Sequence, residues 1–206
     1  MLTPRLLFGG PADAVPIVVL AHGAGAAMDS PFMDGFAGGL AAAGFRVARF
    51  EFPYMQLARA TGTRRPPDRM PTLLDTWRTV IDSLGARKLV IGGKSMGGRV
   101  ASMLADEARV RGLLCLGYPF HAPSKPAGRR IAHLSDMNTP TLIVQGTRDT
   151  MGRRQEVEAY ALSPAVRVAW IEDGDHSFVP RKASGRTIEA NMRAAIDAAT
   201  AFLSER

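Results

Sequence analysis

Short apolar runs alternate along the chain with segments whose apolar residues recur at helical spacing. The runs are typical of buried strands and lie at residues 16–21, 45–52, 88–92, 110–116, 141–145 and 166–171. Helical spacing is found at residues 31–43, 71–84, 99–107, 153–162 and 187–203. Because strands and helices alternate, the pattern predicts a mostly parallel sheet with helices on both faces, which is a three-layer α/β/α sandwich.

Two stretches, residues 53–70 and 117–138, lack a clear period and are interpreted as irregular. We expect the first to be a surface loop, and both to border any binding site. The chain has 206 residues, of which 46% are apolar, so it can bury a full core but is short for two domains. We therefore expect a single domain over residues 1–206.

Charge and cysteine content narrow the class of protein. The formal net charge is +7, but the basic residues come as scattered pairs, which does not favour binding to nucleic acid. Cys115 is the only cysteine, so neither an intramolecular disulfide nor a CxxC metal site is expected. The first ten residues do not resemble a signal peptide, and no apolar run reaches the length of a membrane span. These features predict a soluble, cytoplasmic protein with no membrane partner.

The strongest chemical motif follows the predicted strand 88–92 and reads Gly93-Lys94-Ser95-Met96-Gly97. A G-x-S-x-G sequence between a strand and a helix is the pattern of a nucleophile elbow, in which a sharp turn presents the serine hydroxyl above the sheet. The same letters resemble the end of a phosphate-binding loop, but Lys88 stands where that motif needs its first glycine. Ser95 is therefore the predicted nucleophile.

A serine hydroxyl needs a base, and the chain has four histidines: His22, His121, His133 and His176. His176 follows a late strand and fits the order serine, acid, histidine expected of such a site. Asp149 directly follows the strand 141–145 and is the predicted acid that orients the base. Asp173 and Asp175 are alternatives, although Asp175 is adjacent to His176 and poorly placed to reach its ring.

A tetrahedral intermediate also needs backbone N–H donors for its oxyanion. The predicted donors are Met96, after the nucleophile, and Gly23 or Ala24 in the turn after the first strand. Four further residues are candidates for substrate binding: Tyr54, Tyr118, Phe120 and His121. Three arginines are candidates for favouring an anionic acyl group: Arg64, Arg65 and Arg148.

Taken together, these motifs resemble the α/β-hydrolase superfamily over about residues 15–180. More narrowly, the segments 22–26, 28–33, 50–54, 92–99 and 117–121 resemble small dienelactone-hydrolase-like proteins, which include a testis-expressed vertebrate protein and a hydrolase-like domain of a nuclear histone-acetyltransferase complex. The resemblance implies the α/β-hydrolase fold and a triad at Ser95, Asp149 and His176. Dienelactone hydrolases use cysteine where this chain has Ser95, so their substrate does not carry over. No long insertion forms a cap, so we expect an open, shallow site.

The predicted function is hydrolysis of a small carboxylic ester or related acyl substrate through an acyl-Ser95 intermediate, without a metal or cofactor. A non-catalytic binding module with the same fold is one alternative, because fold alone does not establish activity. Acyl transfer or perhydrolysis on the same triad is another. The sequence does not predict the oligomeric state.

Overall fold

A computed structural model describes residues 4–122 and 130–206. These residues contain one seven-stranded sheet with the strand order β1-β3-β2-β4-β5-β6-β7. The strands are β1 (Leu6–Gly9), β2 (Ile17–Ala21), β3 (Arg46–Phe50), β4 (Leu89–Lys94), β5 (Gly112–Leu116), β6 (Thr141–Gly146) and β7 (Val166–Ile171). The edge strand β1 runs antiparallel to β3, and the other neighbouring pairs are parallel.

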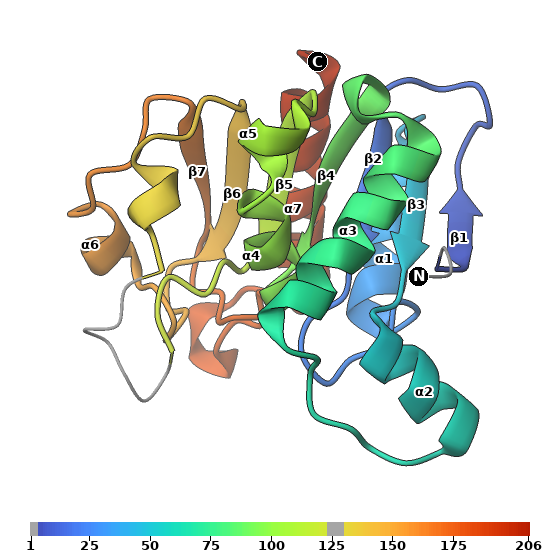
Figure 1. Ribbon diagram of the computed structural model, residues 1–206. Helices are drawn as coiled ribbons and strands as arrows, with labels where there is room; N and C mark the ends of the chain where they lie inside the picture. Colours follow the sequence, from blue (N-terminus) through green and yellow to red (C-terminus); the bar gives the residue numbers. More distant parts are fainter. Residues whose placement is uncertain (1–3, 123–129) are drawn as a thin grey trace.

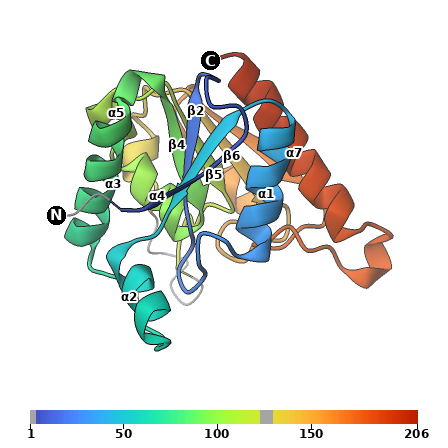
Figure 2. The same cartoon turned by 90° about the vertical axis from the view of Figure 1, so that its right-hand side faces the viewer.

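Helices cover both faces of this sheet (Figures 1 and 2). They are α1 (Pro31–Ala42), α2 (Pro53–Thr61), α3 (Met70–Leu84), α4 (Met96–Ser102), α5 (Ala105–Ala108), α6 (Arg154–Val157) and α7 (Ile188–Ser204). Single 3₁₀ turns lie at Ala86–Lys88, Ala132–Leu134 and Lys182–Ser184. Helices α1 and α7 lie on one face and α3, α4 and α5 on the other, while α2 projects away from the sheet (Figure 2). The predicted three-layer α/β/α architecture is confirmed. None of the helices in the described ranges is long and apolar enough to cross a membrane.

Strand β2 shows why continuous apolar runs form the centre of the sheet. All five of its residues are buried, because helices cover both of its faces. Successive side chains point to opposite faces, so Val18 belongs to the core cluster of α1 and α7. Val19 belongs to the other cluster, which includes Trp77 of α3 and Val100 of α4.

Several predicted boundaries need correction. Residues 53–61 form helix α2, so their interpretation as a loop was wrong. Pro53 occupies the first turn and Gly62, at φ 66°, ends the helix in a left-handed conformation, which are typical start and stop signals. The sequence analysis missed β1, and the helix predicted to reach residue 107 is divided into α4 and α5. The helix predicted over residues 153–162 ends at Val157.

The parallel register brings the predicted site residues to one edge of the sheet. Lys94 at the end of β4 pairs with Leu116 of β5, and Leu116 pairs with Val144 of β6. Gly146 in turn pairs with Ile171 at the end of β7. The segments that follow these strands therefore emerge side by side at the carboxyl edge, where open α/β sheets bind their ligands.

Candidate active site

Ser95 lies in a sharp turn between β4 and α4, with φ 49° and ψ −113°. This left-handed backbone conformation is uncommon for a residue with a side chain, and such strain is typical of functional sites. Two glycines make the turn sterically feasible, because a Cβ atom at either Gly93 or Gly97 would collide with the Ala21 carbonyl oxygen. The glycine spacing of the motif is thus a packing requirement of the turn.

The structure places His176 directly beside Asp149. Their Nδ1 and Oδ2 atoms are 2.7 Å apart, and the Asp149 side chain is fully buried. The Asp149 carboxylate also accepts hydrogen bonds from the side-chain amide of Gln145, at 2.9 Å, and from the backbone N–H of Met151, also at 2.9 Å. With three donors around it, this carboxylate is held in one orientation and in turn fixes the imidazole ring.

The two alternative acids have other partners. Asp175 accepts hydrogen bonds from the backbone N–H groups of Ser177 and Val179, and so stabilises its own turn. Asp173 accepts from the backbone and guanidinium of Arg181, and this pairing lowers the pKa of the Asp173 carboxyl. Neither carboxylate hydrogen-bonds to His176 in the part of the chain that the structure describes.

Ser95 and His176 line the same cavity, which has a volume of about 590 Å³. Since Nδ1 of His176 faces Asp149, Nε2 is the ring nitrogen left to exchange a proton. The structure has no hydrogen bond between the Ser95 hydroxyl and His176, both of which lie within the described ranges. Such contacts are often long in ligand-free sites and shorten when substrate binds.

The three predicted oxyanion donors, Gly23, Ala24 and Met96, also line this cavity. Their backbone N–H groups have no acceptor among the described residues, so they are available to a ligand. The preceding residue, His22, is fully buried and accepts the N–H of Phe52 at its Nε2 while Nδ1 lies 2.8 Å from the Gly23 oxygen. Burial lowers the pKa of His22. This histidine is therefore a neutral support of the turn.

Lys94 links the turn at Ser95 to the loop that carries His176. Its ammonium group donates a 2.7 Å hydrogen bond to the His176 backbone oxygen and lies 5.4 Å from the centre of the Phe32 ring. Burial lowers the pKa of Lys94 to about 8, although the charges of Asp149 and Asp175 act in the opposite direction. The sequence analysis did not single out this residue.

The four candidate substrate-binding residues do not lie on the cavity wall. Tyr118 and Phe120 are fully buried and stack edge to face in the core, and Pro119 between them lines the cavity instead. His121 is buried near Glu156. Tyr54 is buried with its hydroxyl 3.4 Å from the Gly25 N–H, so it supports the first turn from behind.

The charged residues on the cavity wall also differ from the predicted ones. Arg64, Arg65 and Arg148 do not belong to it, and Arg148 pairs with Asp173. The basic residues on the wall are Lys94, Arg99 and Arg130. Arg99 follows Ser95 by four residues in a helix, so the helical spacing alone could have placed it beside the nucleophile. The wall also includes Pro67, Asp68, Met70, Leu73 and Met151. Both predicted bordering stretches contribute to it, the first through Pro67, Asp68 and Met70 and the second through Pro119 and Arg130.

A second serine–histidine pair lies near the first. The Ser102 hydroxyl is 2.8 Å from Nε2 of His133, and it also donates to the Arg99 backbone oxygen at 2.7 Å. Ser102 is only 3% exposed and does not line the cavity. Burial, together with the charge of Arg99, lowers the pKa of His133.

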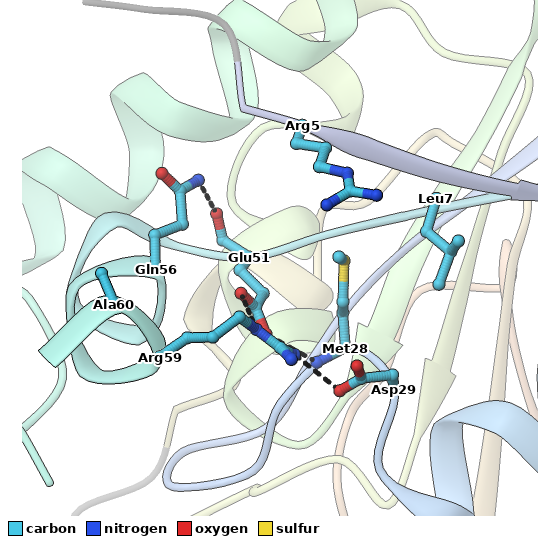
Figure 3. A pocket seen from close by; sticks show the side chains of 8 residues that line it. All are labelled: Arg5, Leu7, Met28, Asp29, Glu51, Gln56, Arg59 and Ala60. Atoms are coloured by element: carbon cyan, nitrogen blue, oxygen red, sulfur yellow. Dashed lines mark hydrogen bonds and ion pairs between the residues drawn. The ribbon is translucent and has the colours of Figure 1, made fainter. Parts of the chain in front are cut away.

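A second cavity, of about 350 Å³, lies between β1, the end of β3 and α2 (Figure 3). Its central feature is the buried carboxylate of Glu51, which pairs with Arg59 at 2.7 Å. Arg59 also pairs with Asp29, and Glu51 accepts the backbone N–H of Met28. This network attaches α2 to the segment after β2, and the cavity contains none of the predicted catalytic residues.

The fold and the serine turn define an α/β protein with the architecture of a hydrolase. Residues 14–204 match the family model for the alpha/beta hydrolase domain, and the chain belongs to the α/β-hydrolase family. The narrower resemblance to the testis-expressed vertebrate protein stays a prediction.

Solved structures with the same fold cover nearly the whole chain. Est1E from Butyrivibrio proteoclasticus is 13% identical with a TM-score of 0.70, over 97% of this chain and 94% of Est1E. An alpha-beta serine hydrolase homologue from Coxiella burnetii is 18% identical with a TM-score of 0.68, over 93% and 90% of the two chains. XC6422 from Xanthomonas campestris, described as a serine hydrolase without lid, is 19% identical with a TM-score of 0.69, over 96% and 88%.

Proposed function

We propose that the protein is a serine hydrolase that cleaves a carboxylic ester or a related acyl bond through an acyl-Ser95 intermediate. One observation carries the proposal. Ser95, in a strained turn, lines the same cavity as His176, whose Nδ1 is held 2.7 Å from the buried carboxylate of Asp149. Family membership and the serine hydrolases of the same fold support this assignment.

In the proposed acylation step, Nε2 of His176 takes the proton of Ser95 while the serine oxygen forms a bond to the substrate carbonyl carbon. The bond to the leaving alcohol then breaks, and His176 returns the proton to that alcohol. In deacylation, the oxygen of a water molecule bonds to the acyl carbon while His176 takes a proton from that water. The bond between the acyl carbon and the Ser95 hydroxyl oxygen then breaks as His176 returns the proton to that oxygen, and the carboxylic acid is released. Asp149 stabilises the imidazolium that forms in each step.

The negative oxygen of each tetrahedral intermediate needs donors that are already in place. Met96, Gly23 and Ala24 line the cavity, and their backbone N–H groups have no acceptor among the residues that the structure describes. The network around His22 fixes the turn that holds Gly23, so little reorganisation is needed when the charge develops. A non-catalytic binding module would have no need of these unpaired donors beside an oriented histidine.

The test is release of 4-nitrophenol from acetyl, butyryl and octanoyl esters by the purified protein, with an acid quench to trap an acyl adduct. We expect an adduct on Ser95, and we expect Ser95→Ala to reduce kcat by at least about 10⁴-fold. Ser177→Ala is the matched control, because Ser177 also lines the cavity, and it should retain activity. A wild-type rate in a folded Ser95→Ala variant would overturn the proposal, as would the absence of turnover with every ester.

A further inference from the structure

Three basic side chains and one acidic side chain contribute charge to the wall of the cavity beside Ser95. Lys94 is engaged by the His176 backbone oxygen, and Asp68 accepts the backbone N–H of Tyr54. Arg99 and Arg130 form no ion pair within the described ranges. The wall therefore has two guanidinium groups without a carboxylate partner from the described chain.

Arg99 is positioned by the same turn as the nucleophile. Its backbone N–H donates to the backbone carbonyl oxygen of Ser95 at 3.0 Å, so the two residues are one helical turn apart. The Nε atom of Arg99 is buried and has no acceptor among the described residues. A partly buried guanidinium that has no carboxylate partner is costly, and an anion bound in the cavity that Arg99 lines would offset that cost.

Arg130 is held in place through its backbone. Its N–H donates to the Phe120 oxygen at 2.7 Å, and its own oxygen accepts the Tyr118 hydroxyl at 3.1 Å. Burial lowers the pKa of Arg99, and the charge of Arg130 lowers it further. Both residues line the same cavity, so an anion bound there would offset the repulsion between their like charges.

We infer that Arg99 and Arg130 form a subsite for a carboxylate group of the substrate, so that the preferred substrates are esters that carry a second, free carboxylate. This inference rests on the proposed function at Ser95. Guanidinium groups bind carboxylates through paired hydrogen bonds, which fits a planar anion better than a neutral chain. An adipate monoester carries an ester carbonyl and a free carboxylate on one short, flexible chain, so it is a suitable probe for a cavity that Ser95, Arg99 and Arg130 line together.

The test compares kcat/KM for 4-nitrophenyl hydrogen adipate with kcat/KM for 4-nitrophenyl hexanoate, which has the same length but no charge. The variants are Arg99→Gln and Arg130→Gln. Arg64→Gln is the control, because Arg64 is exposed and lies on a different surface. We expect the wild type to prefer the adipate ester. Each cavity variant should reduce this preference by about tenfold or more, mainly through KM, while the control leaves it unchanged.

If the ratio of kcat/KM for the adipate ester to kcat/KM for the hexanoate ester is equal in the wild type and in both cavity variants, the inference is overturned. Ser95-dependent hydrolysis of the hexanoate ester would still leave the proposed function intact. If neither ester is hydrolysed, the proposed function fails, and calorimetric titration with adipate decides the inference separately. Binding to the wild type that weakens in both variants supports the subsite. No binding to the wild type overturns it.

Discussion

Helix α4 has a serine at each end, and each serine lies near a histidine. Ser102, its last residue, is in direct contact with His133 at 2.8 Å, but it is buried in regular helix, away from the cavity. Ser95, at the N-cap, has no hydrogen bond to His176 among the described residues, but both line the cavity. His176 is oriented by a buried carboxylate, whereas His133 has no hydrogen bond to a carboxylate within the described ranges.

This difference shows that a short serine–histidine contact does not identify a nucleophile. The Ser102 hydroxyl donates its one proton to the Arg99 backbone oxygen, and its own oxygen can accept from Nε2 of His133, so these contacts satisfy a buried polar group. The Ser95 environment instead has access for a substrate, unpaired N–H donors and backbone strain. Substitution by alanine is therefore expected to reduce activity but not stability at Ser95, and to reduce stability but not activity at Ser102.

The largest expected effect comes from Ser95→Ala. Removing the nucleophile of a triad eliminates nearly all of its rate enhancement, so we expect kcat to fall by at least about 10⁴-fold. The free energy of unfolding should not decrease, because alanine leaves no buried polar group unpaired. Steady-state kinetics and urea unfolding measure the two quantities. A small decrease in kcat would remove Ser95 from the mechanism.

Asp149→Asn should reduce kcat by about 10²- to 10⁴-fold. An amide cannot stabilise the imidazolium, and its NH₂ group favours the wrong tautomer of His176. Activity within tenfold of the wild type would show that Asp149 only packs the loop. Asp175→Asn is the matched control, since Asp175 neighbours His176 but bonds only to backbone N–H groups of its own turn.

Lys94→Met removes the hydrogen bond that links the turn at Ser95 to the loop of His176. Its effect is tested by the pH dependence of stability. The native pKa of Lys94 is about 8 and its ordinary value is 10.5, so the unfolded chain binds more protons between these limits. Wild-type stability should therefore rise relative to the variant from pH 8 to 10.5, by up to about 3 kcal/mol. Urea unfolding of both proteins across this range measures the difference between their unfolding free energies. The contributions of groups that titrate in both proteins cancel in this difference. A difference in unfolding free energy that does not change with pH would show that the pKa of Lys94 is not lowered in the folded protein.

Ser102→Ala should have the smallest effect on activity, with kcat/KM changed by less than about tenfold because the side chain does not reach the cavity. The variant leaves a His133 nitrogen without its main partner, and we expect a loss of about 1–3 kcal/mol in unfolding free energy. Thermal and urea unfolding measure this loss. A collapse of activity in a stable Ser102→Ala variant would reverse the comparison between the two serines.

Much of the fold could be predicted because its central strands are largely apolar runs near glycine or proline. The run at residues 16–21 contains β2, whose five residues are all buried. Helix α2 was missed because it buries only Tyr54 and most of its other residues are exposed, so it lacks a strong apolar period. Its buried Tyr54 and the contact between Glu51 and Arg59 become visible only in three dimensions.

The site, too, could be predicted only in part from the sequence. Ser95, His176, Gly23, Ala24 and Met96 line one cavity, because the chain order after parallel strands determines which loops meet. Sequence position could not show which way a side chain after β5 points. Tyr118 and Phe120 were therefore predicted on the wall, where Pro119 lies instead. Nor could sequence position show that Arg148 pairs with Asp173 while Arg130 has no ion pair among the described residues.

Covalent labelling with a fluorophosphonate tests the central claim most directly, because the reagent reacts with a serine activated by an oriented base. Trypsin cleaves after Lys94 and Arg99, so Ser95 and Ser102 lie in different peptides and mass spectrometry can distinguish them. We predict stoichiometric modification of the Ser95 peptide, lost in His176→Ala and retained in His133→Ala. Modification of the Ser102 peptide, or no labelling of the folded wild-type protein, would contradict the assignment of Ser95 as the nucleophile.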